Sequence, residues 1–139
     1  MDIIQAYIDK NRFGEWLGMS FEILEPGIVA YKLAIQEKHL ATPMHAHGGC
    51  IASLMDATLG VGALSLVSNE QKVVSTVDLS MQFLTGVKSS DQLIAYSKCL
   101  KKGNKLIFTP SMYSEAWSVS LSSDGSMLAA GAPYGGTTY

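Results

Sequence analysis

The sequence has few charged residues and only two cysteines, and each shortage excludes a class of protein. Charged residues make up 16% of the 139 residues, with ten Lys and Arg against twelve Asp and Glu. The resulting net charge of −2 argues against a dedicated nucleic-acid-binding protein, which usually has a strong basic excess. Cys50 and Cys99 are too isolated for a disulfide framework or a cysteine zinc motif, so we expect a reducing, cytoplasmic compartment.

Hydrophobic residues make up 47% of the chain, which is typical of a folded globular protein. No repeat, charge block or linker divides residues 1–139, so we expect one domain. The first ten residues carry Asp2 and Asp9 and lack the pattern of a signal peptide. Residues 48–67 are apolar enough for a membrane span, but Asp56 near the middle and the absence of flanking Lys or Arg favour a helix buried in protein.

The hydrophobic pattern predicts an α+β fold. Apolar residues recur with helical spacing over 2–11, and the chain then alternates apolar and polar residues in a hairpin over 19–35. The long apolar helix follows a loop over 41–47. We expect further strands at 73–83, 92–100, 105–113 and near 127–134. An antiparallel sheet that wraps the apolar helix satisfies this order, and its edges and remaining apolar surface would favour dimerisation.

Asp56 is the residue that packing does not explain. It is the only charged residue between His47 and Glu70. Burial of an unpaired carboxylate destabilises the folded protein by roughly several kcal/mol. Asp56 must therefore be protonated, hydrogen-bonded or at an interface. Two readings stay open: a helix position that reaches solvent or caps a loop, or a general base or nucleophile in an apolar site.

His47-Gly48-Gly49 precedes the long helix directly. Free amides in a first helical turn, together with the helix dipole, can stabilise a developing oxyanion on an acyl carbonyl. The alternative is a flexible junction between loop and helix. Gly48 and Asp56 are about 12 Å apart along one helix axis, too far to act on one carbonyl, so cooperation would need two helices, most simply across a two-fold axis.

The stretch HGGCIASLMD, His47 to Asp56, resembles the signature of the hotdog-fold acyl-CoA thioesterases. The similar branch is that of the phenylacetate-pathway and 4-hydroxybenzoyl-CoA enzymes. Leu17-Gly18, the strand from Ser75 to Leu79 and the turn from Lys101 to Lys105 also correspond, so the similarity covers most of the chain. The resemblance implies a long central helix wrapped by a five- or six-stranded antiparallel sheet. It also implies a homodimer, often a homotetramer, with the site between two protomers.

By position, the resemblance implies a role for each site residue. The Gly48 amide would polarise the thioester carbonyl, and Asp56 of the opposing protomer would activate water or attack directly. Thr76 would position that water or the acid, and His47 would orient the loop and the thioester. Gly49 would belong to the substrate-binding loop.

One departure from the family pattern concerns the loop before the helix. Ala41 stands where the family usually has Asn or Gln in contact with the thioester, and Met44 stands where a Gly is common. Three outcomes are open: Thr42 or His45 supplies the missing contact, turnover is weak, or the protein only binds its ligand.

Two further clusters have competing interpretations. Lys98, Lys101, Lys102 and Lys105 surround a turn and would either bind the phosphates of coenzyme A or form a solvated hairpin tip. His39, His45 and His47 with Asp56 lack the tight ligand spacing of a zinc site, so we expect no metal. Coenzyme A enters only as part of the substrate, and no separate cofactor is expected.

The leading hypothesis is hydrolysis of an acyl- or aryl-CoA thioester. The alternative is a non-catalytic protein that binds acyl-CoA, which the substitution at Ala41 favours. A hotdog dehydratase is a third reading, but the His and acid order typical of that class is not seen. The sequence leaves the acyl preference, and the choice of coenzyme A or acyl carrier protein, undetermined.

Overall fold

The computed structural model describes residues 2–70, 72–76, 79–83, 85–102, 106–108 and 111–112. From residue 100 onward the description is of the backbone only. The elements, in chain order, are α1 Ile3–Lys10, α2 Arg12–Leu17, β1 Met19–Glu25, β2 Ile28–Ala34, the 3₁₀ helix η1 Glu37–His39, α3 Gly48–Val67, the 3₁₀ helix η2 Ser68–Glu70, β3 Gln92–Tyr96, β4 Cys99–Lys102, β5 Leu106–Phe108 and β6 Ser111–Met112.

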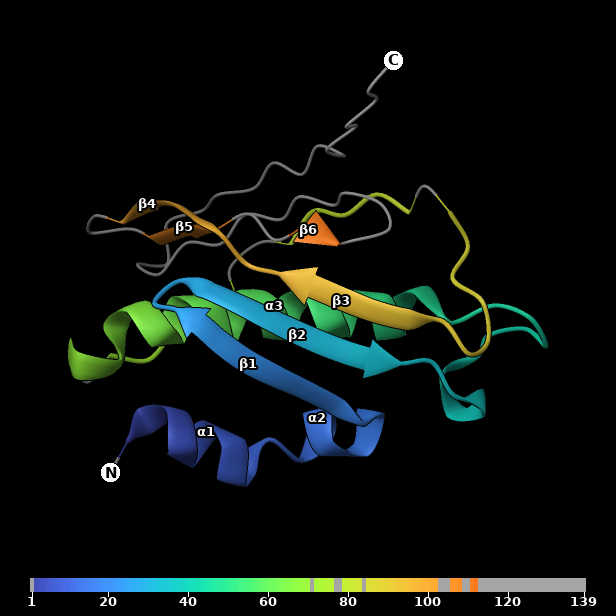
Figure 1. The fold of residues 1–139 in the computed structure, drawn as a ribbon, viewed down its shortest axis with the longest axis horizontal. Helices are drawn as coiled ribbons and strands as arrows, with labels where there is room; N and C mark the ends of the chain where they lie inside the picture. Colours follow the sequence, from blue (N-terminus) through green and yellow to red (C-terminus); the bar gives the residue numbers. More distant parts are fainter. Residues whose placement is uncertain are drawn as a thin grey trace, which may run out of the picture.

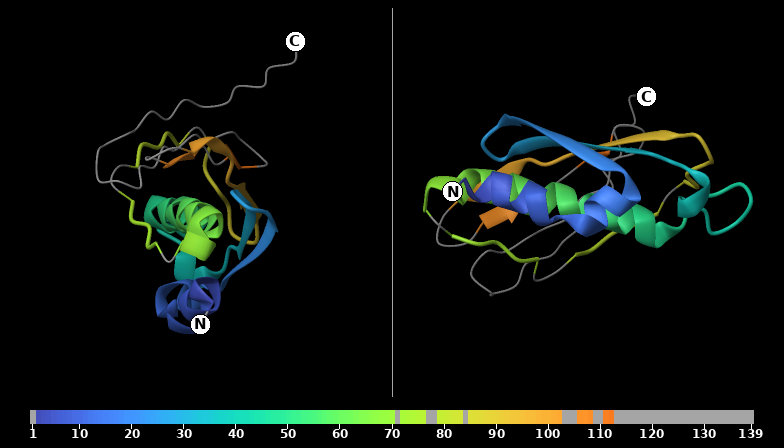
Figure 2. Two further views of the ribbon diagram at one scale, coloured as in Figure 1. Left: turned by 90° about the vertical axis from the view of Figure 1, so that its left-hand side faces the viewer. Right: turned by 90° about the horizontal axis from the view of Figure 1, so that it is seen from below.

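The strands form antiparallel ladders that curve around α3 (Figure 1). One sheet has the order β1-β2-β3-β6, and β4 pairs with β5. The hairpin of β1 and β2 places Phe21 opposite Tyr31 and turns at Gly27, whose φ of +86° favours glycine. The end-on view shows α3 enclosed by the curving strands on one side, with α1 on another (Figure 2).

The helix α3 is the centre of the core. In its first half the buried residues share one face and Asp56 is exposed on the other, whereas from residue 61 to residue 67 nearly every residue is buried. It is also the one helix in the described part of the chain that is long and apolar enough to cross a membrane, and 67% of its most apolar window is buried. Fully buried side chains of α3 and β2 form the contact between the helix and the sheet. They are Leu54, Met55, Leu59 and Val61 on α3 and Val29, Tyr31 and Leu33 on β2.

Two buried serines fasten the hairpin turn, Ser65 to α3 and Ser97 to the end of β3. The Ser65 hydroxyl accepts a hydrogen bond from the Gly27 amide at 2.8 Å and donates to the Gly62 carbonyl at 2.7 Å. The Ser97 hydroxyl accepts from the Val29 amide and donates to the Gly27 carbonyl, both at 3.0 Å. These bonds satisfy polar groups that burial would otherwise leave without partners, so they fix β2 against the helix.

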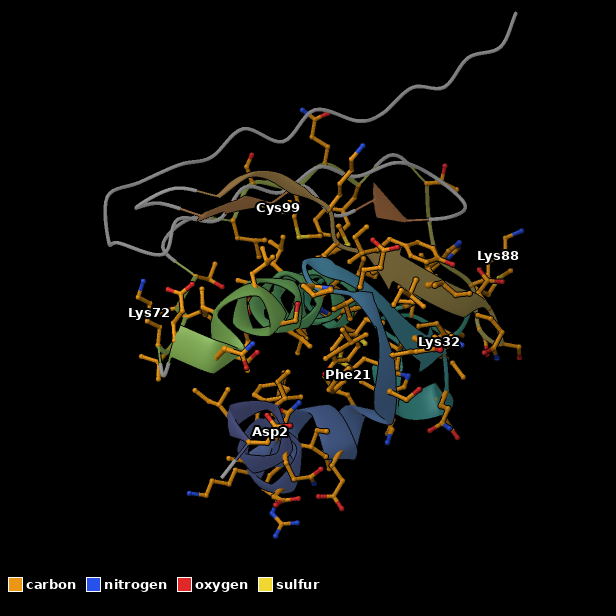
Figure 3. All side chains as sticks on the ribbon, turned by 60° about the vertical axis from the view of Figure 1, so that its left-hand side comes forward. Asp2, Phe21, Lys32, Lys72, Lys88 and Cys99 are labelled. Carbon is orange, nitrogen blue, oxygen red and sulfur yellow. The ribbon has the colours of Figure 1, made fainter. Side chains whose placement is uncertain are left out.

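The N-terminal helices pack below the sheet. Asp2 caps α1 through a hydrogen bond from the Ile4 amide, and Asn11 caps α2 through one from the Gly14 amide. Phe21, labelled in Figure 3, lies between these helices and the strands, with its ring centre 5.0 Å from that of Tyr31.

The predicted helices over 2–11 and 48–67 and the hairpin over 19–35 are confirmed. The prediction of one strand over 92–100 is wrong in part, because the chain breaks at Ser97, whose amide and hydroxyl both bond to the β2 hairpin. Residues 72–76 and 79–83 are not assigned to a hydrogen-bonded strand, although a strand was expected there. The strand expected over 105–113 is seen as β5 and β6. Pro110 and the strand expected near 127–134 lie outside the described residues.

Candidate functional site

Asp56 and Thr76 form a hydrogen-bonded pair. Asp56 lies near the middle of α3, and the Thr76 hydroxyl donates to its Oδ1 at 2.5 Å. Asp56 is exposed in the single chain rather than enclosed by apolar residues. Of the readings left open by the sequence, the single chain shows a helix position that reaches solvent, and its carboxylate is hydrogen-bonded rather than buried. A hydroxyl at this distance can hold a carboxylate in a fixed orientation.

The pair borders a cavity of about 560 Å³ between α1, α3 and residues 73–76. A volume of this size falls within the range of small-molecule sites. Carbon-rich side chains from both helices form most of its wall. The lining residues are Ile3, Ala6, Tyr7, Lys10, Asn11, Asp56, Ala57, Gly60, Leu64, Val73, Val74, Ser75 and Thr76.

The N-terminus of α3 has the geometry of a capped helix. His47 is the N-cap, and its Nδ1 accepts a hydrogen bond from the Gly49 amide at 2.8 Å. The His47 carbonyl accepts from the Cys50 amide at 2.9 Å. His47 therefore fixes the backbone at the first turn, in which the Gly48 amide lies. The ring of Phe83 lies beside Gly48, at ordinary contact distance from where a β-carbon would be.

Gly48 and Asp56 are joined by an uninterrupted stretch of α3. Eight residues of α-helix separate them by about 12 Å along the axis. Within one chain the helix start and the carboxylate are thus apart, whereas Asp56 and Thr76 are together.

The loop before α3 brings Thr42 and His45 together in an exposed turn. The Thr42 hydroxyl accepts a hydrogen bond from the His45 amide at 3.1 Å, and the His45 carbonyl accepts one from the Ala41 amide at 2.9 Å. The His47 amide donates to the His39 carbonyl at 2.7 Å, which fastens the loop to η1. This turn leads directly into the helix start.

Of the predicted lysines, Lys98 is exposed just before β4, and the backbone of Lys101 and Lys102 lies within that strand. Lys105 lies outside the described residues.

Cys50 lies in the first turn of α3 and is buried. Burial raises the pKa of the Cys50 thiol, an effect that the nearby Lys38 charge opposes. A thiol of this kind is a poor nucleophile, so Cys50 serves as a small core residue. Among the described residues no group of three His, Cys, Asp or Glu side chains is placed to hold a metal ion.

The wall of the cavity opposite α3 was not predicted from the sequence. Ile3, Ala6, Tyr7 and Lys10 lie one helical turn apart on α1, and Ala57, Gly60 and Leu64 have the matching spacing on α3. The helical spacing was visible in the sequence, but no signal showed that the two faces meet.

The chain is similar to known proteins both in sequence and in structure. The model of the thioesterase superfamily matches residues 44–109. A Schizosaccharomyces pombe protein that carries an esterase name is 31% identical over 109 residues, which are 76% of this chain and 66% of that protein. Human acyl-coenzyme A thioesterase 13 is 24% identical over 110 residues, covering 78% of this chain and 76% of that protein.

Among solved structures, the Escherichia coli PaaI protein from the phenylacetic acid degradation operon has a TM-score of 0.70 at 15% identity. The match covers 86% of this chain and 83% of that one. The expected fold class is confirmed by these neighbours and by the central helix packed against an antiparallel sheet. The chain therefore has the hotdog fold of thioesterase structures, and its residues 44–109 match the thioesterase superfamily.

Proposed function

We propose that this protein hydrolyses an acyl- or aryl-CoA thioester. The observation that carries the proposal is the Asp56–Thr76 hydrogen bond at the edge of the cavity between α1 and α3. The match to the thioesterase superfamily and the similarity to an acyl-coenzyme A thioesterase support this reaction.

The chemistry needs a base or nucleophile and a group that stabilises the oxyanion. Asp56, oriented by Thr76, either takes a proton from the attacking water or attacks the carbonyl carbon itself. The Gly48 amide, with its turn fixed by His47, donates to the carbonyl oxygen as negative charge develops there. The bond from carbonyl carbon to sulfur then breaks, and the sulfur of coenzyme A takes up a proton and leaves as the thiol. When water attacks, the carboxylic acid forms directly and the proton that Asp56 took from the water goes to the sulfur. When Asp56 attacks, an anhydride with its carboxylate forms, and a water molecule then hydrolyses it to the carboxylic acid and free Asp56. No separate cofactor takes part.

We further propose that the active unit is a homodimer in which Gly48 of one chain meets Asp56 of the other. The separation of about 12 Å along α3 supports a two-chain site. Residues 72–76 and 79–83 run beside α3. They carry the exposed side chains of Val73 and Phe83. A second copy would cover this apolar surface. We also propose that the dimers associate into a homotetramer and that the protein is cytoplasmic.

The loop before the helix also bears on the substrate. Thr42 and His45, held in one turn next to the helix start, would contact the thioester in place of the amide side chain absent at Ala41. Gly49 would line the same turn, and Lys101, Lys102 and Lys105 would meet the phosphates of coenzyme A. The phenylacetate-type branch, with its preference for aryl thioesters, is a finer part of this proposal.

The test is release of free thiol from a panel of acyl- and aryl-CoA esters by the wild type and by Asp56→Asn. This change keeps the size of the side chain and removes its charge. We expect kcat to fall by about 10²–10⁴-fold, with the urea unfolding curve unchanged because Asp56 is exposed. Full activity in the variant would contradict the mechanism. Saturable binding of acyl-CoA without thiol release by the wild type would favour the alternative of a non-catalytic acyl-CoA-binding protein.

A further inference from the structure

The cavity beside Asp56 extends along α3 toward its C-terminal half. Gly60 comes one turn after Asp56, about 6 Å along the axis, and lines the cavity with Ala57 and Leu64. A β-carbon built on Gly60 would meet no atom within 4 Å. The glycine therefore leaves open space next to the acid, where a larger residue would project into the cavity.

The opposite wall comes from α1 and its C-cap Asn11, and the amide of Asn11 is already hydrogen-bonded. The Asn11 amide nitrogen donates to the Tyr7 hydroxyl at 2.9 Å and to the Tyr31 hydroxyl at 3.4 Å, and Asn11 Oδ1 accepts from the Gly14 amide at 3.0 Å. Asn11 is thus committed to holding α1, α2 and β2 together. What remains for an occupant along this wall is the apolar surface of Ile3, Ala6 and the Tyr7 ring, with the exposed Lys10 at the end of the helix.

We propose that this cavity receives the acyl or aryl group of the thioester, and that Gly60 sets the size of group admitted. The inference rests on the proposed function, because the Asp56–Thr76 pair at the cavity edge fixes where the reacting carbonyl lies. An apolar chain attached to that carbonyl would enter the space between α1 and α3. Polar residues at the site would contact the thioester end, and carbon atoms would contact the rest.

The physical expectation is a dependence of affinity on alkyl length. Each methylene buried in an apolar pocket contributes about fourfold in affinity. The gain should continue until the alkyl group fills the cavity. A leucine at position 60, whose β-carbon would meet no atom within 4 Å, would project into the space beside Asp56 and end the gain after fewer carbons.

The experiment measures binding of S-alkyl-CoA thioethers by titration calorimetry. These probes lack the carbonyl group and cannot be hydrolysed, so the readout does not depend on turnover. The wild type, Gly60→Leu and Gly60→Ala are compared over a series of alkyl lengths. Asn69→Leu adds the same side chain at an exposed position outside the cavity and serves as the matched control.

We expect affinity to rise with alkyl length in the wild type and in Asn69→Leu. In Gly60→Leu the longest alkyl groups should lose at least tenfold, while the shortest bind as before. Affinity that does not depend on alkyl length in the wild type, or an identical profile in Gly60→Leu with an intact urea unfolding curve, would overturn the proposal.

Failure of this inference is distinguishable from failure of the proposed function. If Gly60→Leu hydrolyses long and short esters as the wild type does, the cavity is not the acyl site although the enzyme is a thioesterase. If the thioethers bind with the expected profile but no ester is hydrolysed, the cavity assignment stands and the hydrolase proposal fails.

Discussion

The hydroxyl of Ser97 occupies the space into which any side chain at Gly62 would project. Ser97 is buried and holds both Val29 and Gly27 of the hairpin, so it has no room to move away. Gly62 therefore allows α3 to approach the sheet closely.

Gly62→Ala should lower the free energy of unfolding by about 1–3 kcal/mol, because the added methyl group overpacks the contact with Ser97. Gly60→Ala, two residues earlier on the same helix, should instead raise it by up to about 1 kcal/mol, because alanine favours the helix and has open space there. Urea unfolding of both variants measures the difference. Equal effects at the two positions would contradict this account.

Thr76→Val should lower kcat by about 10- to 100-fold, because the carboxylate of Asp56 loses the donor that orients it. Thr76→Ser keeps the hydroxyl and should recover most of the rate. Stability should change by less than about 0.5 kcal/mol in both variants, because the hydrogen bond is exposed. Loss of rate in Thr76→Ser together with a full rate in Thr76→Val, which keeps the methyl group, would assign the effect to packing rather than to the hydrogen bond.

Gly48→Pro should abolish most of the activity without unfolding α3. Proline removes the backbone N–H, and it suits the first helical position because His47 already has the extended backbone, with φ −69° and ψ 132°, that precedes proline. Gly48→Ala retains the N–H and is the matched control, since its β-carbon meets Phe83 only at contact distance. Thiol release from a thioester measures both.

The same variant tests the two-chain site. Unfolding and refolding Gly48→Pro together with Asp56→Asn should restore about a quarter of the wild-type rate, because half of the random dimers would carry one intact site. A site built within one chain predicts no recovery above the sum of the separate variants.

Tyr31 should make stability depend on alkaline pH. Burial, and secondarily the neighbouring Tyr7, raise the pKa of Tyr31 far above its ordinary value of 10.0. The stabilisation is fully present below pH 10. Above it the unfolded chain loses the proton that the folded chain keeps, so the free energy of unfolding falls by up to about 1.4 kcal/mol per pH unit.

Urea unfolding at several values above and below pH 10 measures this slope. Tyr31→Phe retains the ring and lacks the ionisable hydroxyl, so its stability should fall less steeply over the same range. Parallel slopes in the two proteins would contradict the assignment to Tyr31.

The sequence predicted the elements whose pattern is local. The apolar run of α3 and the alternation of β1 and β2 fix their conformation within a few residues. No helix was expected over residues 12–17, because two glycines, Gly14 and Gly18, lie within six residues of each other there. In the structure Gly14 donates its amide to the capping Asn11, and Gly18, at φ +76°, ends the helix. The spacing of a capping Asn and a terminal Gly was the available signal.

Pairing over long range was harder to predict. The alternation over residues 73–83 indicates an extended chain but does not say which edge it pairs with, since the period of two fixes only which side chains share a face. The contact of Thr76 with Asp56 spans 20 residues and was expected only from the resemblance to a family. The cavity wall on α1 depends on how two helices dock, which neither helix encodes alone.

No residue of α1 is buried, although one side of the helix faces the cavity. Its backbone hydrogen bonds should therefore open at a lower free energy than those of α3, and its amides should exchange with deuterium sooner. An occupant that touches both helices adds contacts that are lost when α1 detaches, so it raises the cost of that opening. The rate of amide exchange over Ile3–Lys10 would then report whether the cavity is occupied, even when no chemical step takes place.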